Sequence, residues 1–325
     1  MRRSPSLLAG AVLVVALAAP AVADSADDQF TIKDPRITES SGLAASHAHP
    51  GIYWTHNDSD DGAYLYAVDS KTGETVATIT MTGVGAPRDV EAISIGPDDN
   101  LYVGDIGDNL GGKWDHVWIY KLPEPKVLKD QTIRATQYVV KYADGPRNAE
   151  ALMVHPKTGR VYIVDKNEDG GHLYEGPAQL SASGTNVFKS VATVDLWATD
   201  AAFSPDGKEL AVRGYFGGIA YDWNGGKLKR QGRLNVPLQG QGESLTYSPD
   251  GSKLMYGSEG ADSSVQPEDA PGASGSGAKS PSGGGSSADG GGNDSGMSGG
   301  FKVGAIAVAA AFAVVISFRR LLRRS

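Results

Sequence analysis

Cysteine is absent from all 325 residues of this sequence. Small exported domains often depend on disulfides, so a chain without them must be stabilised by the burial of apolar side chains alone. Common enzyme motifs are missing as well: the folded region contains no GxSxG, and the chain contains no HExxH and no phosphate-binding GxxxxGK[ST]. These absences exclude a disulfide scaffold and give no sign of a serine nucleophile, a zinc protease or a P-loop.

Long apolar runs are confined to the two ends of the chain. The first covers Leu7–Ala19, begins after Arg2 and Arg3, and precedes the small-residue segment 21–23. A positive start, a short apolar core and a small-x-small site are typical of a secretory signal peptide, and this core is too short to span a bilayer. We expect residues 1–23 to be a signal peptide that is cleaved after Ala23.

The second apolar run, Val303–Phe318, is followed by a basic cluster at Arg319, Arg320, Arg323 and Arg324. Its length is near the lower limit for a spanning helix, roughly 17 residues. A buried core helix is the alternative, but the basic flank and the polar segment before the run favour an anchor. By the positive-inside rule we expect a transmembrane helix at 301–318, a cytoplasmic tail at 319–325, and the N-terminal domain outside the cell membrane.

Between these ends, residues 262–300 are dominated by Gly, Ser, Ala and Asp. Such a composition cannot form a core, so we expect a flexible linker that tethers a folded ectodomain at 24–261. The whole chain has a formal charge of −8, and its terminal segments hold seven basic residues and no acid, so residues 24–300 carry −15. This charge argues against nucleic acid or anionic lipid as a partner and leaves cations, basic polymers and neutral ligands open.

An internal repeat of about 40–60 residues runs through the ectodomain. Its clearest copies are Pro87–Ile93 and Pro146–Leu152, which read PRDVEAI and PRNAEAL. Each copy leads to a turn, such as the Ser-Pro-Asp-Gly of residues 204–207, and then to a run of β-branched or aromatic residues. Because Pro fixes φ and Gly accepts a positive φ, these turns are typical of β-hairpins.

The repeat predicts an all-β fold, a β-propeller. Two weaker strand signals follow in each copy, and four short antiparallel strands per repeat are the signature of a propeller blade. A spare strand, Gln29–Lys33, would complete the last blade, close the ring and remove an open edge. About five four-stranded blades are expected, from copies that begin near Ser41, Pro87, Pro146, Asp200 and Glu243.

Acidic residues recur at the same place in each repeat. If the inner strands begin at one face and the second strands return to it, both sets of ends surround the mouth of a central channel. Several carboxylates in one small volume repel one another unless a cation compensates them, and oxygen ligands favour Ca²⁺. The predicted metal ligands are Asn57, Glu91, Asp105, Glu150, Asp165, Asp200 and Glu243.

Other roles for these residues stay open. The acids could accept backbone hydrogen bonds from the neighbouring blade, or hold an ion whose role is purely structural. Basic residues near the acidic ring could pair with it or hold an anionic substrate such as a phosphate. The predicted ligand-binding residues are Arg88, Arg147, Lys166, Arg213 and Glu259.

Several of these segments resemble a group of secreted β-propeller proteins of actinobacteria, over about Ile37 to Glu259. The most specific piece is Gly-Asp-Ile-Gly-Asp-Asn at 104–109. More remotely, Glu243–Leu245 with Ser258 and Glu259 is similar to the phytase-like esterase propellers. The axial acids resemble those of the gluconolactonase propellers, whose ion is held by Glu, Asn and Asp. These resemblances imply the fold, whereas fold does not imply an activity.

Two functions therefore remain open. The first is a surface-displayed binding or scaffold domain, a monomer with an unidentified extracellular ligand. The second is a metal-dependent hydrolase of esters, lactones or phosphoesters, in which metal-activated water replaces the missing nucleophile. The sequence does not decide whether the chain is an enzyme.

The expected topology can be tested on whole cells. Protease added to intact cells or spheroplasts should release a fragment that ends within residues 262–300, because the ectodomain and linker lie outside the membrane. Immunoblotting of the supernatant measures this release. A fragment that appears only after the membrane is lysed would contradict the orientation inferred from the C-terminal arginines.

Overall fold

Every regular element that the computed structural model describes, in residues 28–59 and 61–272, is a β-strand. Those residues contain no helix long and apolar enough to cross a membrane. The signal peptide, the helix at 301–318, the tail at 319–325 and most of the linker were predicted for residues outside this described part. They stay predictions.

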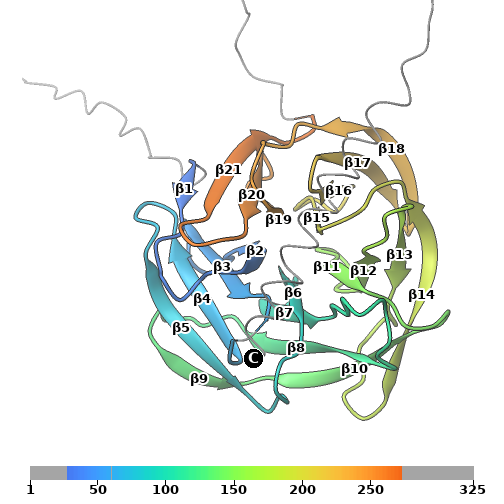
Figure 1. Cartoon of the computed structure of the whole chain (residues 1–325), viewed down its shortest axis with the longest axis horizontal. Coiled ribbons are helices and arrows are strands. Elements are labelled where there is room, and N and C mark those ends of the chain that lie inside the picture. Colours follow the sequence, from blue (N-terminus) through green and yellow to red (C-terminus); the bar gives the residue numbers. More distant parts are fainter. Residues whose placement is uncertain (1–27, 60, 273–325) are drawn as a thin grey trace, which may run out of the picture. The chain divides into compact units, whose positions relative to one another are not determined.

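The strands form antiparallel units of four, each ordered from the centre outward (Figure 1). The inner strands are β2 (Ser40–Ala45), β6 (Val90–Ile95), β11 (Ala149–Val154), β15 (Asp200–Phe203) and β19 (Gly242–Tyr247). The second strands are β3 (Ile52–Asn57), β7 (Asn100–Asp105), β12 (Val161–Asp165), β16 (Glu209–Gly214) and β20 (Lys253–Ser258). The third strands are β4 (Tyr64–Asp69), β8 (Val117–Pro123), β13 (Gly171–Glu175), β17 (Gly217–Asn224) and β21 (Ser264–Asp269). The outer strands are β5 (Thr75–Thr82), β10 (Thr136–Tyr142), β14 (Thr185–Val194), β18 (Lys227–Leu234) and β1 (Phe30–Thr31).

The inner strands pack side by side in a closed ring. Strand β2 contacts β6, β6 contacts β11, β11 contacts β15, β15 contacts β19, and β19 contacts β2 again. Figure 1 shows the units radiating from this ring. The all-β propeller expected from the repeats is the fold of the described residues.

The turns between the inner and second strands follow the predicted chemistry. Gly207 and Gly251 adopt φ values of 74° and 76°, which side chains other than glycine rarely tolerate. In the same turns the Ser204 and Ser248 hydroxyls each donate a 2.7 Å hydrogen bond to the aspartate two residues later. The Ser-Pro-Asp-Gly segments therefore fix where each hairpin reverses.

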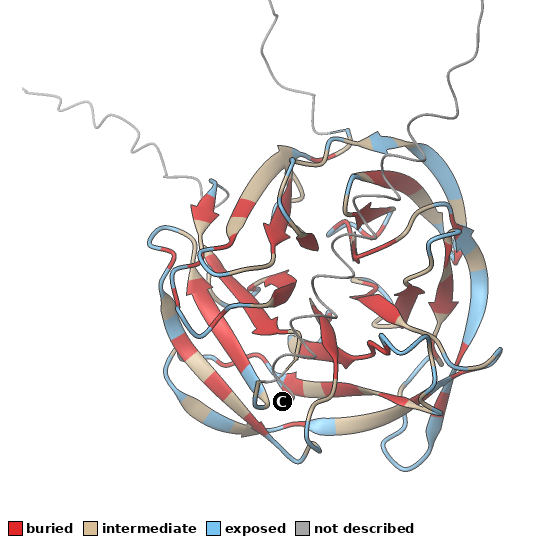
Figure 2. Cartoon of the chain, viewed as in Figure 1, coloured by how far each residue is buried: buried red, intermediate tan, exposed pale blue. Residues whose placement is uncertain are grey.

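The apolar core lies between neighbouring units. One cluster joins Trp54 and Ile79 of the first unit to Leu101 of the second, and all three side chains are fully buried. Figure 2 shows burial concentrated on the inner strands, with exposed stretches on the outer ones. Burial of this apolar surface stabilises the domain in the absence of disulfides.

The outer rim contains a connection that the repeat did not predict. Strand β9 (Gln131–Arg134) pairs in parallel with β5 of the first unit. Strand β10 then pairs with β8 of its own unit and in parallel with β14 of the third. The second unit is thus hydrogen-bonded at the rim to both of its neighbours.

The first and last described strands complete one unit together. Phe30 pairs with Val265 and Thr31 with Ser264, which is the pairing expected for Gln29–Lys33. Strand β21 extends to Asp269, so the predicted start of the linker at residue 262 falls inside this unit. That boundary is corrected to a position beyond Asp269, because the serine-rich segment still contributes backbone hydrogen bonds to a sheet.

Closure of the ring can be tested at Phe30, which is 6% exposed and lies with its ring centroid 5.3 Å from that of Tyr53. Phe30→Ala should lower the free energy of unfolding by about 3 kcal/mol, because it leaves a cavity in the closing unit. Phe216→Ala is the control, since Phe216 is 55% exposed and should change stability little. Equal denaturation midpoints for the Phe30 variant and the parent would contradict a structural role for β1.

Candidate metal centre

A β-bulge recurs at the start of the inner strands. Val90 pairs with Asp105 and Ala92 with Gly104, which leaves Glu91 as an extra residue in β6. The register shifts in the same way around Glu150 in β11 and Glu243 in β19. Bulges re-aim side chains and are frequent beside functional sites. Three glutamates therefore occupy equivalent irregular positions at the mouth of the ring.

On one side of the mouth, the side chain of Lys166 compensates the negative charge of a glutamate. Lys166 Nζ lies 2.8 Å from Glu150 Oε1 and 2.8 Å from the Tyr215 hydroxyl. Burial disfavours the charge on Lys166, but Glu150, Tyr215 and Glu243 outweigh it and raise the pKa of Lys166 well above its usual range. Lys166 thus acts as a permanent cation beside Glu150.

Glu243 is the third of these glutamates. It is 5% exposed; its Oε1 accepts a 3.0 Å hydrogen bond from Gln241, and its Oε2 has no hydrogen-bond partner among the described residues. Burial raises the pKa of Glu243 to about 8, partly offset by Lys166 and reinforced by Glu150. Burial therefore favours the protonated form of this carboxyl.

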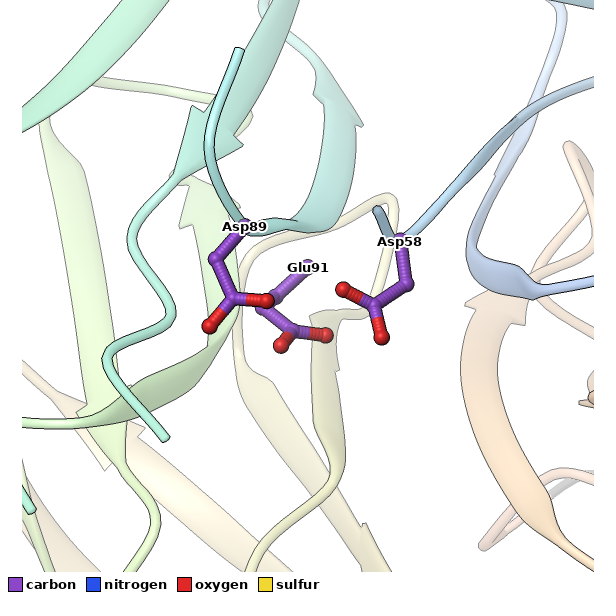
Figure 3. A group of neighbouring side chains, drawn as sticks. All are labelled: Asp58, Asp89 and Glu91. Carbon is purple, nitrogen blue, oxygen red and sulfur yellow. The ribbon is translucent and has the colours of Figure 1, made fainter. Parts of the chain in front are cut away.

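The other side of the mouth holds a group of three carboxylates. The ligand atoms of Asp58, Asp89 and Glu91 all lie within 4.8 Å of one another. Figure 3 shows the three side chains turned toward a common space. Asp89 and Glu91 are buried, and Asp58 is half-buried. Burial raises the pKa of Glu91 well above its usual range, and the charges of Asp58, Glu150 and Asp89 add to this effect.

Neighbouring groups hold two of these carboxylates in place. The Ser41 hydroxyl donates to Glu91 Oε2 at 2.9 Å, and the Asn109 amide donates to Asp89 Oδ2 at 3.0 Å. A Cβ at Gly107 would lie 2.7 Å from both Asp89 Oδ2 and Glu91 Oε1. The loop after β7 can close over the carboxylates only because residue 107 lacks a side chain.

This donor set suits a hard divalent cation. Ca²⁺ takes 6–8 oxygen ligands at about 2.3–2.6 Å, and carboxylates are its usual charged ligands. The three acids supply oxygen only, which disfavours zinc or copper. Asp58 stands on the exposed side, where water could supply further oxygens.

The other predicted metal ligands act in hydrogen bonding within the fold. Asp105 accepts the backbone N–H groups of Arg88 and Asp89, both at 3.1 Å, and Asn57 Oδ1 accepts those of Thr38 and Glu39, both at 3.0 Å. Asp165 accepts the His172 N–H at 2.5 Å, and Asp200 accepts the Leu245 N–H of the next unit at 2.6 Å. Of the predicted set, the structure brings only Glu91 into the carboxylate group.

The predicted ligand-binding residues are also dispersed. Arg88 stacks between Trp114 and Trp118, with its guanidinium carbon 4.0 and 3.7 Å from the ring centroids. Arg147 donates to the Tyr174 hydroxyl, and Arg213 donates to the carbonyls of Ser244 and Gly257 in the closing unit. Glu259 accepts a hydrogen bond from Gln241. Lys166 is the member of this set that pairs with a mouth glutamate.

The predicted set of metal ligands included neither Asp58 nor Asp89. Asp89 stands two residues before Glu91, just before β6 begins. Asp58 directly follows the second strand of the first repeat. The short separation from Glu91 could have identified Asp89, whereas the approach of Asp58 depends on packing between two units.

No family model matches this chain, and no curated protein matches it. The PQQ-bound aldose sugar dehydrogenase of Streptomyces coelicolor is 12% identical, covers 73% of this chain and 96% of that one, and gives a TM-score of 0.43. The soluble aldose sugar dehydrogenase of Escherichia coli, in its apo-form, is 11% identical, covers 73% and 98%, and gives 0.46. A proposed 6-phosphogluconolactonase of Bacteroides uniformis is 14% identical, covers 72% and 68%, and gives 0.41. These structures are propeller-type proteins, but at such TM-scores the likeness carries no argument about activity.

The raised pKa of Glu243 predicts how stability depends on pH. The folded state binds this proton more tightly than the unfolded state, whose carboxyl has its ordinary pKa of 4.5. Proton binding by Glu243 therefore adds its full amount to the free energy of unfolding below pH 4.5. This stabilisation is lost as pH rises to about 8, with a slope of at most about 1.4 kcal/mol per pH unit. Denaturant titrations from pH 5 to 9 should show a smaller decline for Glu243→Gln. Parallel pH curves would contradict the assignment.

Proposed function

We propose that this chain is a membrane-anchored, cell-surface propeller of five blades that binds Ca²⁺, or a similar cation, at Asp58, Asp89 and Glu91. The mouth of the ring would then be the face presented to an extracellular ligand. The observation that carries the proposal is the convergence of three carboxylates, two of them buried, within 4.8 Å.

Electrostatics supports a cation at this position. Ionised carboxylates this close repel one another, and burial increases the cost because water no longer screens them. Lys166 already pairs with Glu150 and Tyr215, so it is shared with the other side of the mouth. A divalent cation would lower the free energy of the ionised group far more than one shared lysine does.

The surface location rests on the sequence. A signal peptide, a Gly- and Ser-rich linker and a C-terminal anchor with a basic flank together favour a domain held outside the membrane. The charge of −15 over residues 24–300 disfavours nucleic acid and favours cations. We propose a monomer, because the ring closes within a single chain.

A metal-dependent hydrolase of esters, lactones or phosphoesters is the second candidate. It is favoured by the half-buried Asp58, which leaves one side of the carboxylate group open to solvent, and by Lys166, whose charge acts on Glu91. A bound metal would lower the pKa of a coordinated water. This chain's own residues would contribute the carboxylates that hold the ion and a cation beside them.

Calcium should stabilise the folded protein measurably. A cation that binds only the folded state adds about 2.7 kcal/mol at one hundred times its Kd, so millimolar CaCl₂ should raise Tm by several degrees and EDTA should reverse the shift. Glu91→Gln and Asp89→Asn should abolish the response by removing ligand charge. Gly107→Ala should do the same by filling the space between the two carboxylates. Differential scanning calorimetry measures each shift.

The matched control is Glu74→Gln, an exposed carboxylate in the β4–β5 turn on the opposite face. It should keep the full calcium response. A parent protein whose Tm is indifferent to CaCl₂ and EDTA would refute the cation site, and the hydrolase with it. Calcium-dependent cleavage of nitrophenyl esters or phosphates that is lost in Glu91→Gln would favour the hydrolase over the binding domain.

A further inference from the structure

The two faces of the ring differ in charge. The second strands end at the mouth, so their connections to the third strands lie on this side, which we name the mouth face. Among their described residues, these connections hold eight acidic and two basic side chains, and one of the bases, Lys166, pairs with Glu150. The hairpins between the inner and second strands, on the opposite face, hold four acidic and three basic side chains. Negative charge is therefore concentrated on the mouth face.

The mouth face also carries large apolar side chains that are open to solvent. Leu110, Phe216 and Leu238 are 66%, 55% and 93% exposed. They lie, in that order, between β7 and β8, between β16 and β17, and in the segment that leads to the start of β19. Among the described residues one other large apolar side chain is more than half exposed, Val127, and it follows β8 on the opposite face. Single exposed apolar residues are ordinary, whereas three around one opening indicate an interaction surface.

The backbone behind these side chains is held in place. Phe216 is at the tip of the tight turn between β16 and β17, beside Tyr215. The Tyr215 ring packs edge-on against Trp197, with the ring centroids 5.3 Å apart. Next to Leu238, the Gln239 amide donates to two backbone carbonyls of the last unit at 3.0 and 3.1 Å. Anchors on a fixed backbone lose less conformational entropy when a partner covers them.

Charge and apolar surface together select the kind of partner. An anionic partner is repelled by the acidic connections, whereas a basic one is attracted and associates faster. A metal ion, or a uniformly basic polymer such as polylysine, leaves Phe216 and Leu238 in water. A polypeptide segment that combines Lys or Arg with Leu, Phe or Trp complements both the charge and the apolar side chains.

We propose that the mouth face docks a basic segment of a partner protein. Its Lys and Arg side chains would lie over the acidic connections, and its apolar side chains would contact Leu110, Phe216 and Leu238. The choice of this face rests on the proposed function, in which the mouth meets the extracellular ligand. The docking itself does not need the cation.

Random peptides of about 12 residues, displayed on phage and selected on the full-length protein in detergent micelles, are the probe. Enriched sequences should combine Lys or Arg with Leu, Phe or Trp. A fluorescein-labelled synthetic copy should bind with a Kd on the order of 10 µM, measured by fluorescence polarisation. Its affinity should fall as NaCl is raised from about 50 to 500 mM, because salt screens exposed charges. Hexalysine should bind at least about tenfold more weakly, since it has no apolar side chain for the exposed anchors.

Variants locate the bound peptide. Phe216→Ala and Leu238→Ala should each weaken binding about tenfold, because a few apolar anchors carry most of the binding energy of an interface. Val127→Ala is the matched control, an exposed apolar residue on the opposite face that should leave the Kd unchanged. Asp169→Asn should weaken binding by removing an exposed charge of the mouth face. Asp99→Asn, in a hairpin on the opposite face, should not, and Asn tolerates its φ of 53°.

The outcomes separate this docking from the cation site. Peptide binding in EDTA that is weakened by Phe216→Ala supports docking even where CaCl₂ leaves Tm unchanged. Enriched peptides without basic residues, or no enriched peptide at all, would overturn it. Equal Kd values for the parent, Phe216→Ala and Leu238→Ala would overturn it as well, because the peptide would then lie elsewhere.

Discussion

Repulsion among buried carboxylates is the constraint that organises the mouth of this ring. The bulges in β6, β11 and β19 direct glutamates to equivalent positions, and three like charges in a poorly screened volume need compensation. The chain meets this need in two ways. The Lys166 side chain supplies a positive charge beside Glu150, and burial favours the protonated form of Glu243. Around Glu91, two further acids converge instead, which concentrates negative charge on one side.

A single loop connects this side of the mouth to Trp114, near the start of β8. Gly107, at the beginning of the loop, approaches Asp89 and Glu91, and Trp114, near its end, stacks on the Arg88 guanidinium. Asp108 lies between them and accepts the backbone N–H groups of Lys113 and Trp114. The Asp108 side chain therefore fixes where Trp114 lies relative to the part of the loop that closes over the carboxylates.

The sequence specified the inner hairpins well because their turns have local causes. Pro, Asp and Gly at residues 205–207 and 249–251 determine the reversal without help from distant residues. It specified the site less well, because a bulge changes which residue faces the axis by one position and leaves no mark in composition. Asp200 illustrates this: its strand has no bulge, and its carboxylate accepts a hydrogen bond from Leu245 instead of joining the carboxylate group.

The sequence did not predict the outer strand β9, for a related reason. Its four residues, Gln131–Arg134, follow no repeat, and their pairing with β5 depends on contacts between two units. Lys166 was foreseen only as one of several cations near the acids. Its pairing with Glu150 required the geometry of two neighbouring strands.

The unit that joins β1 to β21 also sets an order of events during biosynthesis. A chain is made from its N-terminus, so Phe30 emerges long before Val265, its partner across the strands. Until β21 is synthesised, β1 has no partner strand and the ring stays open. The pairings of β5 with β9 and of β10 with β14, at the outer rim, can form before then. The outer-strand pairings can thus join the first three units of the growing chain before β21 is made and the ring closes.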